Sequence, residues 1–254
     1  MKKVNAEKAN YSNWVSTKFI SVPGVVTLFF LILAFVFPVL SIPALIFFSI
    51  AAYFAYARYR FSPSGGDIQT KIQDTLLTNL DWNGLGRVLD IGCGNAPLTI
   101  KLAHTYPEAQ ITGIDYWGEM WEYSKSVCER NAMIEGVASR TSFQKASASD
   151  LPFAHESFDA AVSNLVFHEI RDIKDKQKVI REALRVIKKG GRFAFQDLFL
   201  WKAVYGDINE LVATIKRWGI ASVEFIPTNN LPFIPKALKL PFMVGTIGIL
   251  RGEK

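Results

Sequence analysis

The longest uncharged stretch of the chain lies near its start and limits how this part can fold. No charged residue occurs between Lys18 and Arg58, and most of the 39 intervening positions are apolar. As a single helix, this stretch would measure about 58 Å at 1.5 Å per residue. The hydrocarbon core of a bilayer is only about 30 Å thick, so one membrane-spanning helix does not account for the stretch.

Two prolines divide the stretch near its middle. Pro38 and Pro43 lie close together, and each proline removes a backbone N–H group and restricts the residue before it. We therefore expect the chain to fold back here into a hairpin of two helices, over residues 19–37 and 42–57. The first helix is long enough to cross a bilayer and the second is marginal, so the hairpin either crosses or dips into one leaflet.

Two other interpretations of an apolar N-terminal stretch are less favoured. A secretory signal peptide has a much shorter apolar core and no second helix. A buried hairpin of a soluble fold would need a large enclosing core, which the remaining residues already need for themselves. We therefore predict a membrane hairpin at residues 19–60, preceded by an N-terminal segment at 1–18.

The positions of the basic residues predict the orientation of this hairpin. Cytoplasmic flanks of membrane segments carry an excess of Lys and Arg, and the turn between the two predicted helices carries no charge. Both chain termini and the domain after the hairpin are therefore expected in the cytoplasm. The basic residues that flank the hairpin are Lys2, Lys3, Lys8 and Lys18 before it, and Arg58 and Arg60 after it.

Length and composition leave room for one domain at residues 61–254, since domains usually have roughly 100 to 200 residues. The chain has 254 residues, with 29 Lys and Arg against 23 Asp and Glu. This basic surplus is dispersed and forms no stripe with aromatic residues, which favours an anionic membrane surface as partner over nucleic acid. Cys93 and Cys128 have neither metal-ligand spacing nor a disulfide framework, so no metal is expected and a reducing compartment suits them.

The domain alternates short apolar runs with amphipathic patterns. This alternation is typical of crossover connections and predicts a Rossmann-like, doubly wound α/β sheet that is mostly parallel. The last two runs have no long helix between them and predict an antiparallel C-terminal strand at the edge of the sheet. Strands are expected at 87–91, 110–114, 141–144, 160–163, 192–196, 221–226 and 243–250, and helices at 68–80, 98–105, 119–131, 175–187 and 208–218.

The segment VLDIGCGNA, residues 88–96, is the most informative part of the domain. An apolar strand leads into closely spaced glycines just before a predicted helix. Gly92 and Gly94 can adopt backbone conformations that a Cβ disfavours, and they let the backbone approach a ligand closely. The N–H groups at the start of the following helix favour a carboxylate or phosphate of that ligand.

Two acidic residues near the glycine-rich turn indicate which ligand it binds. Asp115 ends the next predicted strand, 21 residues after Gly94, at the spacing where a carboxylate accepts hydrogen bonds from ribose hydroxyls in wound α/β folds. Asp90 would repel a pyrophosphate but attract a cationic amino group. The sixth position of a G-x-G-x-x-G motif is Pro97, which further separates this site from dinucleotide sites. An adenosine-containing ligand with a cationic group is expected.

From residue 68 to its C-terminus, the chain resembles the class I methyltransferases that use S-adenosylmethionine. The resemblance rests on five segments in the family's order, which are more specific together than any one of them alone. It implies S-adenosyl-L-methionine as cofactor. It also implies that Asp90, Gly92 and Gly94 lie around the methionine part, that Asp115 binds the ribose, and that Tyr116 flanks the adenine.

The resemblance includes two departures from the family pattern. Within ASASDLPF, residues 146–153, the family usually has an acidic residue that contacts the adenine amino group, and Ser147 stands in its place. This leaves the contact to Ser147 or to the backbone of Ala148. Ala96 replaces a glycine found in many relatives, and its small side chain should be tolerated.

Two further segments complete the resemblance. FDAAVSNLVFHEI, residues 158–170, resembles the fourth-strand motif whose end borders the methyl group, and residues 186–195 resemble the turn into the fifth strand. The cofactor-binding residues implied in total are Asp90, Gly92, Cys93, Gly94, Asn95, Asp115, Tyr116, Ser147, Ala148 and Asn164.

Methyl transfer from a sulfonium is an in-line displacement in which the protein mainly positions the two reactants. A protonated acceptor needs a base, and His168 follows the fourth predicted strand on the side where such folds bind ligands. We predict His168 as the catalytic residue and Glu169 as its orienting partner. The alternative is that His168 packs against or caps the following helix. His104 and His155 have less support because they fall in a helix and a surface loop.

The predicted anchor favours a lipophilic methyl acceptor, such as a lipid head group or a quinone, because it concentrates the domain at the bilayer. The loop at residues 230–242 mixes apolar residues with two lysines and is expected to touch the interface and form the substrate entrance, or else to be an ordinary connection. Two alternatives stay open. One is a methyltransferase of a small soluble acceptor such as a thiol, and the other is a non-catalytic module that binds the cofactor.

Overall fold

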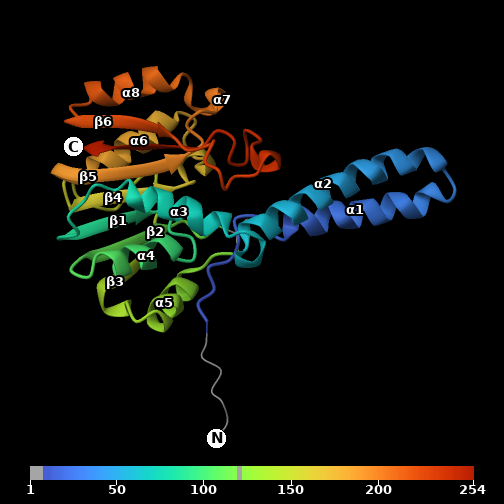
Figure 1. Cartoon of the computed structure of the whole chain (residues 1–254), viewed down its shortest axis with the longest axis horizontal. Helices are drawn as coiled ribbons and strands as arrows, with labels where there is room; N and C mark the ends of the chain where they lie inside the picture. The colour runs from blue at the N-terminus through green and yellow to red at the C-terminus, as the bar shows by residue number, and fades with distance from the viewer. Residues whose placement is uncertain (1–7, 119–121) are drawn as a thin grey trace, which may run out of the picture. The chain divides into compact units, whose positions relative to one another are not determined.

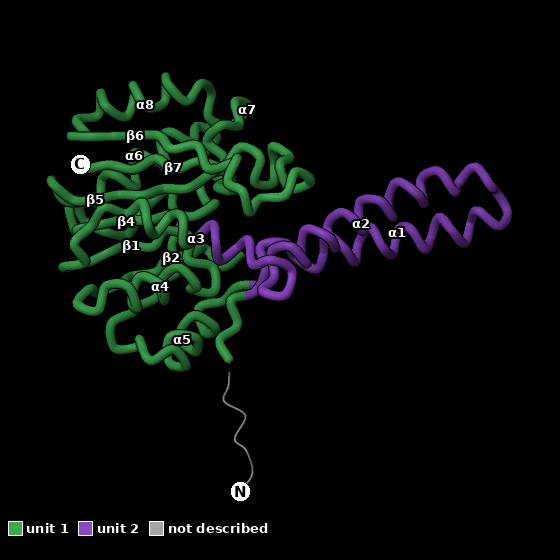
Figure 2. Tube along the Cα trace, viewed as in Figure 1, with its two compact units in different colours: residues 1–11, 73–119, 123–254 green, residues 12–72, 120–122 purple. Residues whose placement is uncertain are grey.

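The computed structural model describes residues 8–118 and 122–254, which form two compact units (Figures 1 and 2). Among these residues, the first unit comprises 8–11, 73–118 and 123–254, and the second comprises 12–72 and 122. The division falls within helix α3, Ile68–Thr78, whereas the sequence interpretation placed the boundary between residues 60 and 61.

The second unit is built around two long helices, α1, Lys18–Ala34, and α2, Ser41–Phe61, which lie side by side as a hairpin (Figure 1). Aromatic side chains join them, with ring centroids 5.1 Å apart for Phe19 and Phe54 and 6.0 Å apart for Phe30 and Phe47. The fold-back predicted from the prolines is therefore present as a helical hairpin. A 3-10 turn, η1, Pro38–Leu40, connects the helices, and a second one, η2, Pro63–Gly65, follows α2.

Helix α2 is longer than predicted and α1 is shorter. Arg58 and Arg60 continue α2 to Phe61, because nothing breaks the helix until the extended residue Ser62 that precedes Pro63. Among the described residues, the segment Pro38–Phe61 is the one that is long and apolar enough to cross a membrane by length and composition, with a mean hydropathy of 2.0. Helix α1 is apolar but falls below that length.

The first unit contains a seven-stranded sheet in the order β3-β2-β1-β4-β5-β7-β6. The first five strands, β1 to β5, pair with one another in parallel. This confirms the mostly parallel sheet predicted from the alternation of apolar runs and amphipathic patterns. Strand β7 is antiparallel to both of its neighbours, β5 and β6. The strands are β1 Arg87–Ile91, β2 Gln110–Asp115, β3 Thr141–Lys145, β4 Phe158–Asn164, β5 Ile187–Asp197, β6 Ser222–Pro227 and β7 Gly248–Glu253.

Alternate residues of the central strands enter two separate cores, as the pleat of a sheet requires. Leu89 of β1 and Phe193 of β5 lie in a core with α6 and α8, while Val88 and Ala194 lie in a core with α4 and α5. The sheet is therefore covered by helices on both faces. These helices are α4 Pro97–Thr105, α5 Lys125–Ile134, α6 Lys176–Arg185, the short α7 Lys202–Tyr205, and α8 Ile208–Arg217.

Three predicted elements of the first unit differ clearly from the structure. The strand predicted at 192–196 is β5, which begins five residues earlier, at Ile187. The C-terminal strand was placed at 243–250 but begins at Gly248, and it lies one position in from the edge, between β5 and β6. The residues before it form turns, where a Cβ on Gly245 would lie 2.1 Å from the carbonyl oxygen of Lys239. The helix predicted at 119–131 is shifted to α5, because Ser124 caps its start by accepting a hydrogen bond from the N–H of Val127. Residues 119–121 of that prediction lie outside the described residues.

Candidate functional site

The topology gathers the predicted site residues at the carboxyl ends of the parallel strands, which we call the ligand end of the sheet. In the strand order, β2 and β3 lie on one side of β1, while β4 and β5 lie on the other. The carboxyl ends of these parallel strands therefore meet where the winding direction changes, and wound α/β folds bind ligands at such a point.

The glycine loop leaves β1 at this point and turns sharply into α4. Gly92 and Gly94 have φ angles of +77° and +57°, which favour glycine. The N–H groups of Gly92 and Cys93 donate to the carbonyl oxygen of Ile114 at 2.7 and 2.8 Å, so the loop is tied to the end of β2. A Cβ on Gly92 would lie 2.1 Å from a methyl carbon of Val166. Only a residue without a side chain fits this part of the loop.

Asp115 ends β2 and binds the same loop. Its carboxylate accepts a hydrogen bond from the N–H of Gly94 at 2.9 Å and another from the N–H of Trp117 at 2.8 Å. A carboxylate can accept about four hydrogen bonds, so acceptor capacity remains for a ligand hydroxyl. Burial raises the pKa of Asp115, while the hydrogen bonds from the backbone act in the opposite direction. The predicted ribose acid and the glycine loop are one connected structure.

Three predicted cofactor residues of this region are almost fully buried. Asp90 is 1% exposed and accepts a hydrogen bond from the Thr99 hydroxyl of α4 at 2.6 Å. Burial raises the pKa of Asp90 to about 7. The Cys93 side chain packs beside β2, where a Cβ on Gly113 would lie 3.1 Å from its sulfur. Asn95 accepts a hydrogen bond from the N–H of Ser124 at 3.1 Å. These side chains hold the loop in place.

The residues predicted around the adenine lie after β2 and β3. Tyr116 is exposed, and the Lys145 ammonium lies 5.2 Å from the centre of its ring. Ser147 donates a hydrogen bond to the Asp172 carboxylate at 3.2 Å, and Ser149 donates to the same oxygen. Hydrogen bonding to Ser149 lowers the pKa of Asp172. The sequence interpretation missed Asp172, which brings a carboxylate to the place where Ser147 replaces the usual acidic residue.

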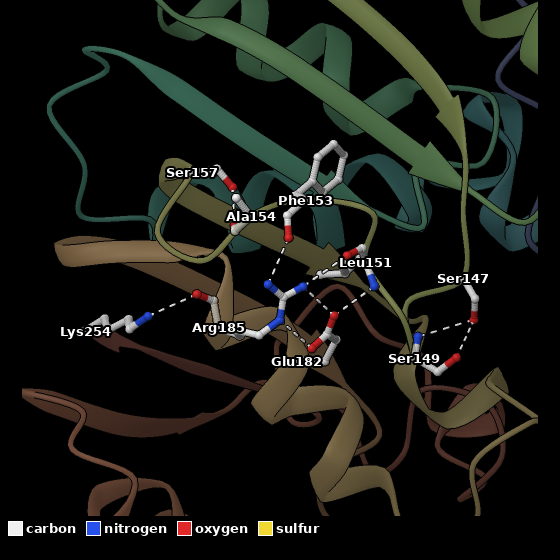
Figure 3. A network of polar contacts seen from close by, with 9 residues as sticks. All are labelled: Ser147, Ser149, Leu151, Phe153, Ala154, Ser157, Glu182, Arg185 and Lys254. Atoms are coloured by element: carbon white, nitrogen blue, oxygen red, sulfur yellow. Dashed lines mark hydrogen bonds and ion pairs between the residues drawn. The ribbon is translucent and has the colours of Figure 1, made fainter.

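A charged network holds Leu151 and Phe153, which follow Ser147 in the same loop (Figure 3). The Arg185 guanidinium at the end of α6 donates to the carbonyl oxygens of Phe153 and Leu151 at 2.8 and 3.0 Å. It also donates to both carboxylate oxygens of Glu182, and one of these accepts the N–H of Leu151. The nearby Ala148 is buried. Helix α6 therefore sets the position of this loop.

Asn164 ends β4 and carries an unused acceptor. Its side-chain oxygen is buried and has no hydrogen-bond partner among the described residues. Buried polar atoms in native structures are nearly always paired, and an unpaired one calls for an explanation. A ligand amino group at the carboxyl end of β4 would satisfy it.

His168 follows β4 in a short 3-10 helix, η4, Phe167–Glu169, and forms a close ion pair with Asp197 at the end of β5. The Nδ1 atom of His168 lies 2.6 Å from the Asp197 carboxylate, which is fully buried. Burial lowers the pKa of His168, but the charge of Asp197 and its hydrogen bond outweigh this effect and raise the pKa to about 10. The imidazole is therefore held in its protonated form at neutral pH.

The predicted partner Glu169 makes the weaker contact, with 3.4 Å between its carboxylate and Nε2 of His168. The sequence interpretation missed Asp197. The sequence did contain a signal for Asp197, because this residue comes at the end of a predicted strand just as Asp115 does. Both strand ends lie at the ligand end of the sheet.

His104 lies on α4, with its Nε2 atom 3.6 Å from Glu135, and His155 lies on the surface. Among residues 8–118 and 122–254, no group of three or more acidic, His or Cys side chains has the arrangement of a metal site.

The doubly wound sheet, the glycine loop and the ribose-type acid together define a class I methyltransferase domain. The comparison with protein families agrees, because the family model described as "Methyltransferase domain" matches residues 83–222. The chain belongs to this methyltransferase family, whose members use S-adenosylmethionine as the methyl donor.

Individual relatives cover the domain only in part. The chain is 33% identical to the ubiquinone/menaquinone biosynthesis C-methyltransferase UbiE of Geotalea daltonii over 126 residues, which are 47% of this chain and 51% of that protein. It is 33% identical to the 27-O-demethylrifamycin SV methyltransferase of Amycolatopsis mediterranei over 131 residues, 52% of this chain and 45% of that protein. The chain spans about half the length of these curated relatives.

Solved structures share the fold. Phosphoethanolamine N-methyltransferase 2 of Haemonchus contortus, in complex with S-adenosyl-L-methionine, has a TM-score of 0.57 and 16% identity, over 80% of this chain and 56% of that one. Geranyl diphosphate C-methyltransferase of Streptomyces coelicolor has a TM-score of 0.52 and 12% identity, over 74% and 79% of the two chains. At these identities the likeness concerns the fold alone.

The residues present fit S-adenosylmethionine. The tight turn of the glycine loop brings its backbone to the end of β1, the Asp115 carboxylate keeps acceptor capacity for a ribose hydroxyl, and the unpaired oxygen of Asn164 suits an ammonium group. These groups come from three neighbouring strand ends and match the three polar parts of the cofactor.

Filling the glycine loop should weaken cofactor binding. In Gly92→Ala the new methyl group would clash with Val166, and the positive φ would be strained, so the loop must shift. We expect the affinity for S-adenosylmethionine to fall by at least about tenfold, or about 1.4 kcal/mol. Isothermal calorimetry measures this. Gly136→Ala is the matched control, because Gly136 also has a positive φ, of +71°, but open space around its Cβ position. Equal affinities of the two variants would contradict the assignment of the loop.

The ion pair of His168 should make stability depend on pH. Because the folded pKa is about 10 and the ordinary value is 6.5, its contribution is full below about pH 6.5 and is lost as the pH rises towards 10. The gap in unfolding free energy between the wild type and Asp197→Asn should therefore narrow from pH 7 to pH 9, by up to about 1.4 kcal/mol per pH unit. Urea unfolding at several pH values measures it.

Asp159→Asn is the control for this experiment, because Asp159 pairs with Lys188 at the start of β4 and not with a histidine. Its gap to the wild type should stay constant over the same range. A constant gap for Asp197→Asn as well would mean that His168 is neutral in the folded protein.

Proposed function

We propose that this protein is a membrane-anchored methyltransferase that transfers the methyl group of S-adenosylmethionine to a lipophilic acceptor. The observation that carries the proposal is the joint presence of two features in one chain. One is a methyltransferase site with the glycine loop and Asp115 in contact, and the other is a helical hairpin with an exposed apolar surface.

The bound cofactor supplies an activated methyl group on a sulfonium, and the residues of the chain position it. Asp115 would hold the ribose, the backbone of the glycine loop and Asn164 would hold the methionine part, and Tyr116 would cover the adenine. The predicted contact of Asp90 with the amino group gives way to a role in holding the loop, since Asp90 is buried under it. In-line transfer then requires the acceptor near the end of β4.

His168 is proposed to orient the acceptor. Its Nδ1 atom is held by Asp197, and 15% of the side chain is exposed. Its Nε2 atom has only the longer contact of 3.4 Å with Glu169, which an acceptor oxygen would share or replace. Because the imidazole is protonated at neutral pH, it would donate a hydrogen bond to an anionic or enolic oxygen of the acceptor more readily than it would remove a proton. This role replaces the base predicted from the sequence.

The membrane part of the proposal is supported by the surface of the hairpin. Large apolar side chains are exposed along both helices, on a scale that soluble monomers rarely show. Basic residues flank the hairpin at its charged end, which agrees with a cytoplasmic location of the domain. The name of the UbiE relative refers to quinone biosynthesis, and quinones are lipophilic acceptors.

The loop at 230–242 is proposed as the acceptor entrance. It follows β6. Because β7 is antiparallel to both β5 and β6, these two strands run in the same direction, so the carboxyl end of β6 lies at the ligand end of the sheet. Leu240 and Phe242 are exposed in it, and Lys239 donates a hydrogen bond to Asn230 at 2.9 Å across its base. An apolar loop at this end suits an acceptor that arrives from a bilayer.

A charge on the hairpin should release the protein from membranes. Leu45→Asp places a carboxylate on the exposed face of α2, where burial in hydrocarbon costs about 2.5 to 3.5 kcal/mol. We expect a larger soluble fraction after ultracentrifugation of cell membranes. Met133→Asp is the control, because Met133 is about as exposed but lies on α5 of the other unit, and its variant should pellet like the wild type.

The same preparations test the activity. Incubation with radiolabelled S-adenosylmethionine and membrane lipid extract should place label in the organic phase for the wild type, and much less for Asp115→Asn. Label in water-soluble acceptors only would favour a small soluble acceptor. Cofactor binding without any transfer would favour the non-catalytic alternative.

A further inference from the structure

We propose that the hairpin is a re-entrant anchor whose tip ends inside the bilayer, so that both of its ends emerge on one face. This inference rests on the proposed membrane anchoring and adds the depth of insertion. It distinguishes between the two arrangements that the sequence leaves open.

The length of the two arms argues against crossing. Helix α1 has 17 residues, which correspond to about 25 Å at 1.5 Å per residue. The uncharged part of α2, residues 41–57, has the same length. The uncharged part of each arm is shorter than the roughly 30 Å of the hydrocarbon core, and any tilt shortens its reach further. The whole of α2, with 21 residues, reaches about 32 Å, but only if its last turn with Arg58 and Arg60 also enters the hydrocarbon. The turn between them would therefore stop short of the far head groups.

The tip has none of the residues that occupy a membrane interface. Phe35 is 92% exposed and Val39 is 67% exposed, and no Trp, Tyr or charged residue occurs between positions 19 and 52. Turns that reach an interface usually carry such residues, because Trp and Tyr prefer the head-group region. An exposed phenylalanine is instead suited to hydrocarbon.

The base of the hairpin has the opposite character. Trp14, Tyr56 and Tyr59 lie there together with the charged residues Lys18 and Arg58. The Arg58 guanidinium donates to the carbonyl oxygen of Val15, and the Asn13 amide donates to the carbonyl oxygen of Arg58 at 3.0 Å. The second unit thus has one interfacial belt, at one end only.

The backbone of the tip is largely satisfied from within. The N–H groups of Val36 and Phe37 donate to the carbonyl oxygen of Leu33 at 3.0 and 2.9 Å, and that of Leu40 donates to Phe37 at 2.9 Å. Pro38 has no N–H group, and its carbonyl oxygen accepts the hydroxyl of Ser41 at 2.7 Å. Such pairing is what a turn needs in hydrocarbon, where no water replaces a missing partner.

The hydroxyl groups within the helices follow the same pattern. Thr27 donates to the carbonyl oxygen of Pro23, and Ser49 donates to that of Leu45, both at 2.8 Å. Each returns to the preceding turn of its own helix, so no hydroxyl of these two residues requires a solvent partner. The hydroxyl groups of the arms and the tip are therefore compatible with the same apolar surroundings.

Labelling of added cysteines tests the depth. The full chain is expressed in bacterial cells, and right-side-out and inverted membrane vesicles are treated with a membrane-impermeant maleimide. Val39→Cys reports on the tip, and Ser64→Cys, on the exposed 3-10 turn after α2, is the matched control at the base. The native Cys93 and Cys128 are buried, and the unsubstituted chain measures their background.

We expect Ser64→Cys to react in inverted vesicles only, and Val39→Cys to react at least about tenfold more slowly in both orientations until detergent is added, because maleimide reaction requires a hydrated thiolate. Labelling of Val39→Cys in right-side-out vesicles would show that the hairpin crosses and would overturn the inference. Recovery of the chain outside the membrane pellet, with Val39→Cys reactive without detergent, would instead refute the anchoring itself.

Discussion

The hydrogen bond between the Asp115 carboxylate and the N–H of Gly94 is the contact on which the rest of the site depends. It joins the ends of two parallel strands, so the ribose-type acid and the loop that approaches the cofactor are positioned by one another. The loop reaches this contact because two of its residues are glycines with positive φ, and because its own N–H groups bind the end of β2. The sheet thus supplies a rigid frame in which small backbone shifts would remove several cofactor contacts at once.

Features that depend on local pattern were predictable from the sequence. The five parallel strands follow from short apolar runs, and the glycine loop and Asp115 follow from their position at strand ends. Contacts between distant residues were not predictable in this way. Asp172 reaches Ser147 and Asp197 reaches His168 only because the loops at the ligand end of the sheet converge. The hydrophobic periodicity of the sequence gives no information on such contacts. The late start of β7 has a similar origin, because the close approach of Gly245 to Lys239 turns residues that otherwise have strand character.

The two units divide the chemistry of the chain between them. The first unit holds ion pairs such as that of His168 with Asp197 around a methyltransferase site, and the unpaired oxygen of Asn164 there suits a ligand amine. In the second unit, the hydroxyl groups of Thr27 and Ser41 bond to backbone carbonyl oxygens of the hairpin itself, and large apolar side chains are exposed. This division would suit a polar cofactor and a lipophilic acceptor. The cofactor would bind polar groups of the first unit, and the acceptor would come from the apolar surroundings of the second unit.

The most direct test of the central claim is calorimetry of S-adenosylmethionine binding to the wild type, Asp115→Asn and Asp159→Asn. Asp159 is another aspartate of the sheet, but it lies at the start of β4, at the end of the sheet opposite to the ligand end. We expect binding by the wild type and Asp159→Asn, and an affinity roughly 10- to 100-fold lower for Asp115→Asn, since hydrogen bonds to a charged group contribute about 1.5 to 3 kcal/mol. Equal binding by all three proteins, or no binding by a folded wild type, would contradict the account.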